Sequence, residues 1–338
     1  VRLILEKGSQ EETGTNAVEY ITTLATTDTT NLATDDYGNI RYIGKDPNNY
    51  VSIDGQLWRI IGVMKNIDDG AGNKENRVNI IKATSLGSYA WDTSYSTVNS
   101  GYGVNEWSQA KLMKLLNPGY ESETVGGSLY WNSRSGKCYT GQLNGTKSCI
   151  FTLTGIKDKL KTLISDVVWN TGSNGTNGFT STSNGLTKHF YTYERSNNTG
   201  KICKSGKYCN DTVERTTTWT GKVGLMYPSD YGYATSGGST TDRATCLNKE
   251  LYNWGSSISD CHTNDWLFSS FYQWTLSSVA NSSYANGAFF VSNSGSVNFY
   301  TTVYYGTGFV ARPVVYLTSN VGIQSGDGSQ NNPFELSI

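Results

Sequence analysis

Ionic groups are scarce in this sequence. Charged residues account for 16% of the 338 positions, and the formal net charge is -1. Proteins that bind nucleic acid through its phosphates carry clusters of Lys and Arg, and anionic membranes attract similar polybasic segments. The composition therefore predicts neither a nucleic-acid partner nor a polybasic membrane contact.

Long apolar runs are missing as well. No stretch of about 18 apolar residues occurs, so we expect no membrane insertion within this chain. The chain begins at Val1 rather than Met, which leads us to expect that a signal or anchoring segment has been removed from a precursor.

Catalytic motifs are not evident either. The only imidazoles are His189, in a polar Lys-His-Phe-Tyr context, and His262, next to Cys261, and we expect both at the surface rather than in a Ser/His/Asp hydrolase. The sequence contains no Gly-x-Ser-x-Gly elbow, phosphate loop or paired-glycine fingerprint. No carboxylate pair is placed convincingly for glycosidase chemistry. We therefore expect no enzymatic activity and no cofactor.

Oxygen ligands for a metal are equally sparse. A calcium-dependent lectin needs clustered oxygens, and the candidates worth naming are Asp68-Asp69-Gly70 and Asp327. Asp and Gly are ordinary turn residues, so we interpret both places as turns and expect no metal.

Six cysteines are present, and they fall into three closely spaced pairs. Many connectivities are formally allowed, with free thiols as an alternative, and the absence of a Cys-x-x-Cys pair disfavours zinc. Disulfides would place the protein in an oxidising setting, either extracellular or at the surface of a cell or virion. The predicted bridges are Cys138–Cys149, Cys203–Cys209 and Cys246–Cys261.

The chain is rich in aromatic and β-branched residues, which suit strands, and in Gly and Asn, which suit turns. We expect residues 1–45 to be a weakly structured lead-in or stalk and residues 46–338 to form one domain, with a loop-rich insertion near 170–215. Asp54-Gly55, between the β-prone runs 50–53 and 57–63, predicts a hairpin, and 77–83 a third strand.

Two segments have the periodicity of amphipathic helices. In the first, Asn105 is the expected N-cap, Leu112 to Leu116 supply the apolar side, and Pro118-Gly119 ends the helix. The second is expected over residues 154–169. We expect both helices to cover a sheet.

One segment is devoid of charge. None of the 46 residues between Asp265 and Arg312 is charged, where the chain-wide 16% would give about 7. Aromatic residues alternate there with Ser, Asn, Gly and Thr, a mixture that resembles antibody paratopes. The aromatic residues are Phe268, Phe271, Tyr272, Trp274, Tyr284, Phe289, Phe290, Phe299, Tyr300, Tyr304 and Tyr305.

Strand alternation requires part of this segment to be core. We expect an inward-facing set and an exposed set of tyrosines in Ser/Asn/Gly contexts. The inward set is Trp274, Leu276, Phe290, Val297, Val303 and Val310, and the exposed tyrosines are Tyr284, Tyr300, Tyr304 and Tyr305.

The order of motifs here carries a resemblance. Trp274-Thr275-Leu276-Ser277, a run rich in Ala, Asn, Ser and Tyr, then VSNSGSV at 291–297 and ARPVVYL at 311–317 resemble the end of C-type-lectin-like variable proteins, the targets of bacterial and phage diversity-generating retroelements. The resemblance covers roughly the last 70 residues. It departs where Ala311 stands in place of the Gly that usually precedes Arg-Pro.

The resemblance implies a C-type-lectin-like fold on which an error-prone reverse transcriptase diversifies a ligand-binding face. It assigns to that face the residues whose types such codons yield. These residues are Ser269, Ser270, Phe271, Ser283, Tyr284, Asn286, Asn293, Asn298, Tyr300, Tyr304 and Tyr305.

The same fold class includes the formylglycine-generating enzymes, which this chain resembles in overall layout. Those enzymes need reactive cysteines near the C-terminal core, and no cysteine follows Cys261. We therefore predict an α+β protein with a C-type-lectin-like fold and two amphipathic helices on small antiparallel sheets. Its expected role is adhesin-like binding of a protein or glycan ligand on another cell or host surface. The alternative is a pilin-like or shaft subunit whose neutral face makes homotypic contacts.

Overall fold

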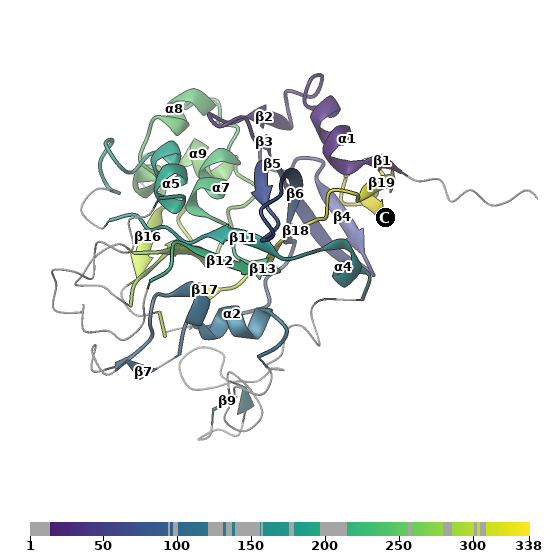
Figure 1. Cartoon of the computed structure of the whole chain (residues 1–338). Helices are drawn as coiled ribbons and strands as arrows, with labels where there is room; N and C mark the ends of the chain where they lie inside the picture. Colours follow the sequence, from purple (N-terminus) through teal and green to yellow (C-terminus); the bar gives the residue numbers. More distant parts are fainter. Residues whose placement is uncertain are drawn as a thin grey trace, which may run out of the picture.

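A computed structural model describes residues 14–93, 95–96, 101–120, 131–132, 137–138, 156, 158–175, 179–196, 215–255, 258–279, 286–300, 303–304 and 309–338. A ten-stranded, largely antiparallel sheet forms its centre (Figure 1). The main path is β1-β19-β20-β4-β5-β6-β18-β13, with β3 paired to β5 and β2 to β3. The strands are β1 (Thr15–Asn16), β2 (Leu32–Thr34), β3 (Ile40–Tyr42), β4 (Tyr50–Ile53), β5 (Gln56–Asp68), β6 (Lys74–Lys82), β13 (Val223–Gly224), β18 (Val314–Tyr316), β19 (Gly322–Ser325) and β20 (Phe334–Ser337).

The predicted hairpin at Asp54-Gly55 is confirmed. These residues join β4 to β5 with φ values of 51° and 74°. Two successive positive φ angles are typical of a type I′ turn, whose twist matches that of the flanking strands. The predicted third strand is β6, which pairs with β5 along most of its length.

The expectation of a weakly structured lead-in is wrong for the part of it from residue 14 onward. Strand β1 pairs with β19, and helix α1 (Ala17–Leu24) buries Ile21 completely. The Asn16 side chain caps α1 by accepting hydrogen bonds from the amides of Val18 and Glu19. A few apolar residues are thus enough to order this segment, because the sheet supplies the surface against which they pack.

The helix predictions are partly correct. The first prediction corresponds to the 3-10 helix η1 (Trp107–Gln109) and α2 (Lys111–Leu116), but Glu106 caps η1, while the Asn105 amide binds backbone carbonyls elsewhere. The second helix, α4, spans only Asp158–Leu163, and 167–170 form strand β11. Pairing with a distant strand explains why residues 167–170 are not helical. Trp169 lies opposite Trp219 across β11 and β12 (Thr218–Gly221), and its indole donates to Gly221 O at 3.0 Å.

The architecture is richer than two helices on small antiparallel sheets. The ten-stranded sheet is mixed, because β20 runs parallel to β4. A second, four-stranded sheet, with the order β16-β15-β14-β17, lies beside a group of short helices at one end of the molecule (Figure 1). The helices are α5 (Thr187–Glu194), α7 (Pro228–Tyr233), α8 (Arg243–Leu247), η2 (Leu251–Gly255) and α9 (Ser259–Thr263). Helix α5 lies within the predicted loop-rich insertion. Two-stranded pairings join β7 (Tyr95–Ser96) to β8 (Gly101–Tyr102) and β9 (Trp131–Asn132) to β10 (Lys137–Cys138).

One predicted disulfide is confirmed. Cys246 of α8 and Cys261 of α9 are joined, with their Cα atoms 5.5 Å apart. Cys138 is described only as part of β10, and Cys149, Cys203 and Cys209 lie outside the described residues. No helix in the described ranges is long and apolar enough to cross a membrane.

Candidate ligand-binding groove

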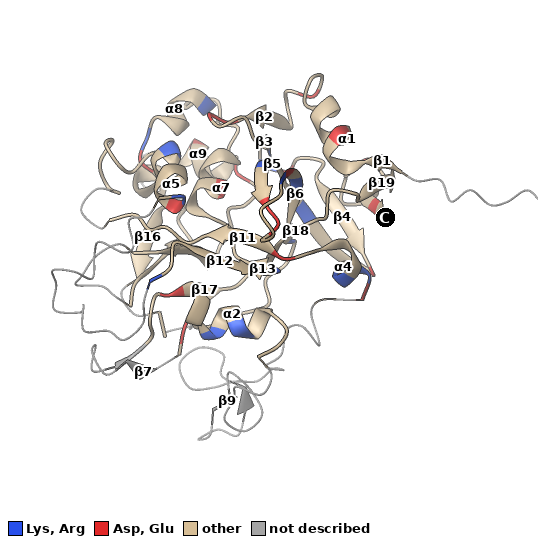
Figure 2. Cartoon of the chain, in the orientation of Figure 1, with Lys and Arg blue, Asp and Glu red and all other residues tan. Residues whose placement is uncertain are grey.

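The four-stranded sheet is built from the charge-free segment. Its strands are β14 (Tyr272–Ser278), β15 (Ala288–Val291), β16 (Val297–Tyr300) and β17 (Phe309–Val310). Figure 2 shows β16 without a charged position. Asp265 and Arg312, which bound the segment, are both buried. Burial raises the pKa of Asp265 well above its usual range and lowers that of Arg312 to about 10.

Residue alternation gives this sheet two different faces. On the inner face, Phe289 and Phe299 pair across the strands and contact Phe179 at ring distances of 5.6 and 5.5 Å. Phe190 of α5 contacts Phe289 at 5.3 Å. We call the opposite side the groove face; it carries Tyr272, Trp274, Phe290, Asn298, Tyr300 and Phe309.

A groove of about 610 Å³ lies over the groove face. Its floor is aromatic: the Phe309 ring lies 5.3 Å from Tyr272, 5.0 Å from Phe290 and 5.0 Å from Tyr300. None of the residues that line the groove carries a charge at neutral pH. They are Tyr252, Tyr272, Phe290, Ser292, Asn293, Ser294, Ser296, Asn298, Tyr300 and Phe309.

The polar rim is the turn between β15 and β16. Ser292 Oγ accepts from the Ser296 amide at 3.0 Å, and the Tyr231 hydroxyl donates to Gly295 O at 2.7 Å. Gly295 has a φ of 90°, and a Cβ at this position would lie 2.3 Å from His262 Cγ. The turn is therefore held in one conformation, with Asn293 exposed at its tip.

The two asparagines of the groove retain free hydrogen-bonding groups. Asn293 makes no hydrogen bond to a described residue, and Asn298 uses only Oδ1, which accepts from the Phe299 amide at 2.8 Å. A ligand in the groove would thus meet amide donors and acceptors above aromatic rings.

The predicted contact residues separate into three groups. Asn293, Asn298 and Tyr300 line the groove. Ser269, Ser270 and Phe271 precede β14 outside the groove, with Phe271 58% exposed, while Asn286 and Tyr304 are half-buried and do not line it. Ser283, Tyr284 and Tyr305 lie outside the described residues.

The predicted core residues of this segment are confirmed. Trp274, Leu276, Phe290, Val297, Val303 and Val310 are all buried. Phe290 nevertheless forms part of the groove floor. Tyr252, Phe309 and the serines of the rim also line the groove, although no sequence pattern predicts them as ligand contacts. The alternation of Tyr272 and Trp274 along the sequence indicates that both side chains lie on the same face of their strand. The sequence does not indicate which distant strands pair with β14, and this pairing brings Phe309 to that face.

The expectation of two surface histidines is wrong for His262. Its side chain is buried, Nδ1 lies 3.0 Å from Trp254 O, and its ring contacts Phe268 at 4.8 Å. His189 is half-buried, and burial lowers its pKa. The buried His262 ring packs against the turn between β15 and β16 at Gly295.

Among the residues that the structure describes, no group of three or more His, Cys, Asp or Glu side chains is placed to hold a metal ion. In comparisons with known proteins, no family model, curated protein or solved structure matches this chain.

Proposed function

We propose that this protein is a non-enzymatic surface binding protein that recognises its ligand in the groove. The observation that carries the proposal is the composition of the lining: aromatic rings, serines and asparagines with no ionic group. Three of the predicted contact residues line this groove. Asn293 lies in the turn between β15 and β16, and Asn298 and Tyr300 lie on β16.

The lining indicates an uncharged ligand surface. Rigid tyrosine rings provide contact area at low entropic cost, and asparagine and serine provide adaptable hydrogen bonds. Without ion pairs in the contact, binding would respond weakly to ionic strength. Suitable ligands are the neutral part of a glycan or of a protein on another cell or host surface.

The finer assignment is a C-type-lectin-like variable protein of a diversity-generating retroelement. Its support is the motif order of the closing segment and the position of Asn293, Asn298 and Tyr300 on a scaffold of buried neighbours. The neighbourhood of the gene tests this assignment: an adjacent reverse-transcriptase gene and a near-copy of the 3′ coding region are expected. A locus lacking both would contradict it.

A location outside the cytoplasm is part of the proposal. The Cys246–Cys261 bridge supports it, because disulfides persist in oxidising compartments.

The absence of a catalytic role is inferred from the groove lining. Its three serines, Ser292, Ser294 and Ser296, have no histidine, lysine or carboxylate among the other lining residues to serve as a base. Recognition alone is therefore the chemistry we assign to the groove.

A pilin-like or shaft subunit is the second candidate. It is favoured by Phe271, which is 58% exposed next to the groove, and by Tyr272, which is 37% exposed and lines it. Such rings would suit a contact with a neighbouring copy. Sedimentation over a range of concentrations separates the two: the binder stays monomeric, whereas a shaft subunit assembles.

The direct test is a binding screen against immobilised glycans and displayed extracellular proteins, using wild type and Asn293→Arg in parallel. Asn293 is exposed at the turn tip, so the substitution should leave folding intact while placing a charged side chain at the groove. The control is Asn331→Arg, an exposed position in another turn. A ligand bound by wild type and the control but not by Asn293→Arg is expected. Equal binding by all three would contradict the proposal.

A further inference from the structure

A second pocket, of about 360 Å³, is lined by residues of β5, β11 and α5 together with Tyr37 of the β2–β3 connection. It shares no lining residue with the groove. Its chemistry also differs, because Lys65 and Arg195 line it and no acidic residue does.

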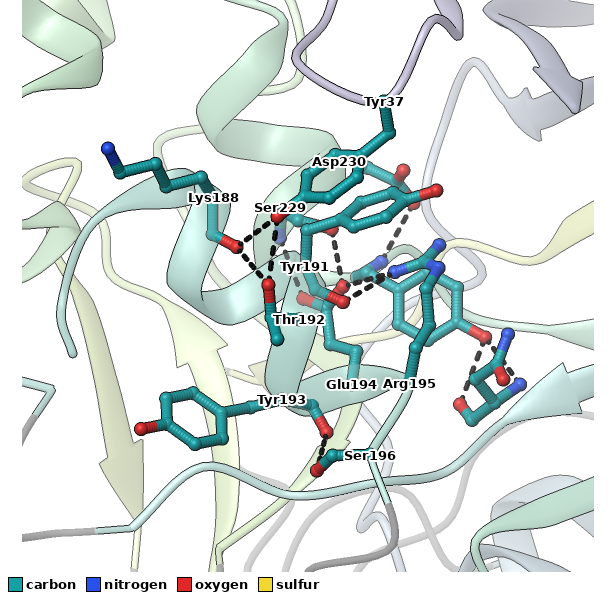
Figure 3. A network of polar contacts seen from close by, with 12 residues as sticks. Tyr37, Lys188, Tyr191, Thr192, Tyr193, Glu194, Arg195, Ser196, Ser229 and Asp230 are labelled. Carbon is teal, nitrogen blue, oxygen red and sulfur yellow. Dashed lines mark hydrogen bonds and ion pairs between the residues drawn. The ribbon is translucent and has the colours of Figure 1, made fainter.

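Aromatic rings hold Arg195 in place. Its guanidinium carbon lies 3.5 Å from the centroid of the Tyr191 ring and 5.1 Å from that of Tyr227. Tyr37 stacks on Tyr191 at 3.9 Å, and its hydroxyl contacts Lys188 O at 3.0 Å and Thr192 Oγ1 at 2.8 Å (Figure 3). The cation is thus positioned before any ligand arrives, which lowers the entropic cost of binding.

Arg195 retains donors for a ligand. Its hydrogen bonds to described residues leave from Nη1 alone, to Tyr191 O at 3.1 Å and to Glu194 Oε2 at 2.9 Å. The side chain is 24% exposed, whereas Glu194 is only 1% exposed and does not line the pocket. Nε and Nη2 therefore have no acceptor among the described residues, and guanidinium donors of this kind suit a carboxylate.

The opposite wall comes from an irregularity in β5. Asn66 has a φ of 55°, and the pairing of β5 with β6 shifts register between Met64 and Ile67. Bulges re-aim side chains and are common beside functional sites. Lys65, next to the bulge, is exposed and makes no ion pair with a described residue. Lys65 is therefore the second cation of the pocket, and, unlike Arg195, it has no carboxylate partner among the described residues.

We propose that this pocket binds an acidic sugar residue, with its carboxylate on Arg195 and Lys65. The carboxylate matches the two cations, and the sugar hydroxyls match the amides of Asn66 and Asn170, which also line the pocket. An acidic peptide side chain offers the same carboxylate but fewer partners for the amides. The pocket shares no lining residue with the groove, so an experiment can contradict the proposal for one site and leave the proposal for the other intact.

Calorimetric titration with methyl β-glucuronide tests the proposal, with methyl β-glucoside as the uncharged probe of similar shape. We expect saturable binding of the glucuronide, with a Kd of roughly millimolar order, and no measurable binding of the glucoside. Equal affinity for both sugars, or no binding of the glucuronide, would overturn the assignment. Tighter binding of Nα-acetyl-glutamate amide would overturn it in favour of a peptide ligand.

Variants locate the binding. Lys65→Gln changes an exposed side chain and should weaken glucuronide binding about fivefold. Arg195→Lys keeps the positive charge beside Glu194 but loses the planar guanidinium, so a loss of about tenfold is expected. The control is Lys188→Gln, whose side chain extends away from Arg195 (Figure 3). Equal effects of Lys65→Gln and Lys188→Gln would contradict a contact in this pocket.

Discussion

Asn298 of β16 lies directly opposite Phe290 of β15, so an amide and an aromatic ring are neighbours on the groove face. Phe290 is 7% exposed, whereas Asn298 is only partly buried and lines the groove beside it. One pair thus combines a floor that stabilises the sheet with a side chain available to a ligand. Substitutions at Asn298 should affect binding more than folding.

Asn298→Ala tests this separation. Loss of one amide contact should weaken ligand binding by about 1 kcal/mol, a factor of roughly five, while the urea midpoint changes little. The measurement pairs a binding isotherm for a ligand from the screen with an unfolding curve. A parallel fall of stability and affinity would instead make Asn298 a structural residue.

The turn at Gly295 should tolerate no side chain. Gly295→Ala combines a φ of 90° with a Cβ 2.3 Å from His262, so we expect destabilisation by more than about 1 kcal/mol and weaker ligand binding. The matched control is Gly72→Ala, where φ is 95° and nothing lies within 4 Å of the added Cβ. Similar urea midpoints for the two variants would show that contact with His262 does not fix the turn.

The bridge between α8 and α9 should stabilise the protein. Replacing Cys246 and Cys261 by Ser is expected to lower the free energy of unfolding by about 2 to 4 kcal/mol. Urea denaturation of the wild type and the double variant measures this difference, and mass spectrometry of alkylated wild type checks that the two thiols are absent. Alkylation of both cysteines without reductant would contradict the bridge.

Glu194 should make stability depend on pH. Burial raises its pKa to about 7, against the opposing effect of Arg195 and hydrogen bonds from Ser229. The folded protein holds the Glu194 proton more tightly than the unfolded chain does. Protonation of Glu194 therefore adds to the free energy of unfolding at low pH, and this stabilisation is lost as the pH rises from about 4.5 through about 7.

Thermal denaturation between these pH values checks the assignment. Glu194→Gln should show a smaller fall in Tm with rising pH than wild type, whereas Glu19→Gln, on the exposed face of α1, should follow wild type. Identical pH profiles for wild type and Glu194→Gln would contradict the raised pKa.

Local chemistry explains which parts of the fold were predictable. Asp54-Gly55 specifies its own hairpin turn, and the apolar residues of β4 and β5 around it alternate clearly. The sequence predicts a helix through residues 167–169 because Val167 continues the helical period of Leu160 and Leu163. Their strand conformation depends on Trp219, some 50 residues away, which the local pattern does not report.

The groove was partly predictable for the same reason. Asn293, Asn298 and Tyr300 lie in one hairpin within the charge-free segment, and the resemblance assigns them to the ligand-binding face. Tyr252 and Phe309 come from separate segments, and Phe309 reaches the floor through parallel pairing with Tyr272. The pocket around Arg195 gave no local signal, because α5, β5 and Tyr37 meet only in the folded chain.

The salt dependence of binding follows from the two different linings. Ligand affinity at the groove should change less than about twofold between low and physiological ionic strength, since no lining residue is charged. Glucuronide affinity at the pocket should fall more steeply over the same range. Titrations in buffers of increasing sodium chloride compare the two sites.

Footprinting of the bound ligand tests the main proposal most directly. Hydroxyl-radical labelling of free and ligand-saturated protein should show protection of Tyr272 and Tyr300, with Tyr37 unchanged as an internal reference. Protection elsewhere with Tyr272 and Tyr300 still labelled would contradict the groove as the ligand-binding site.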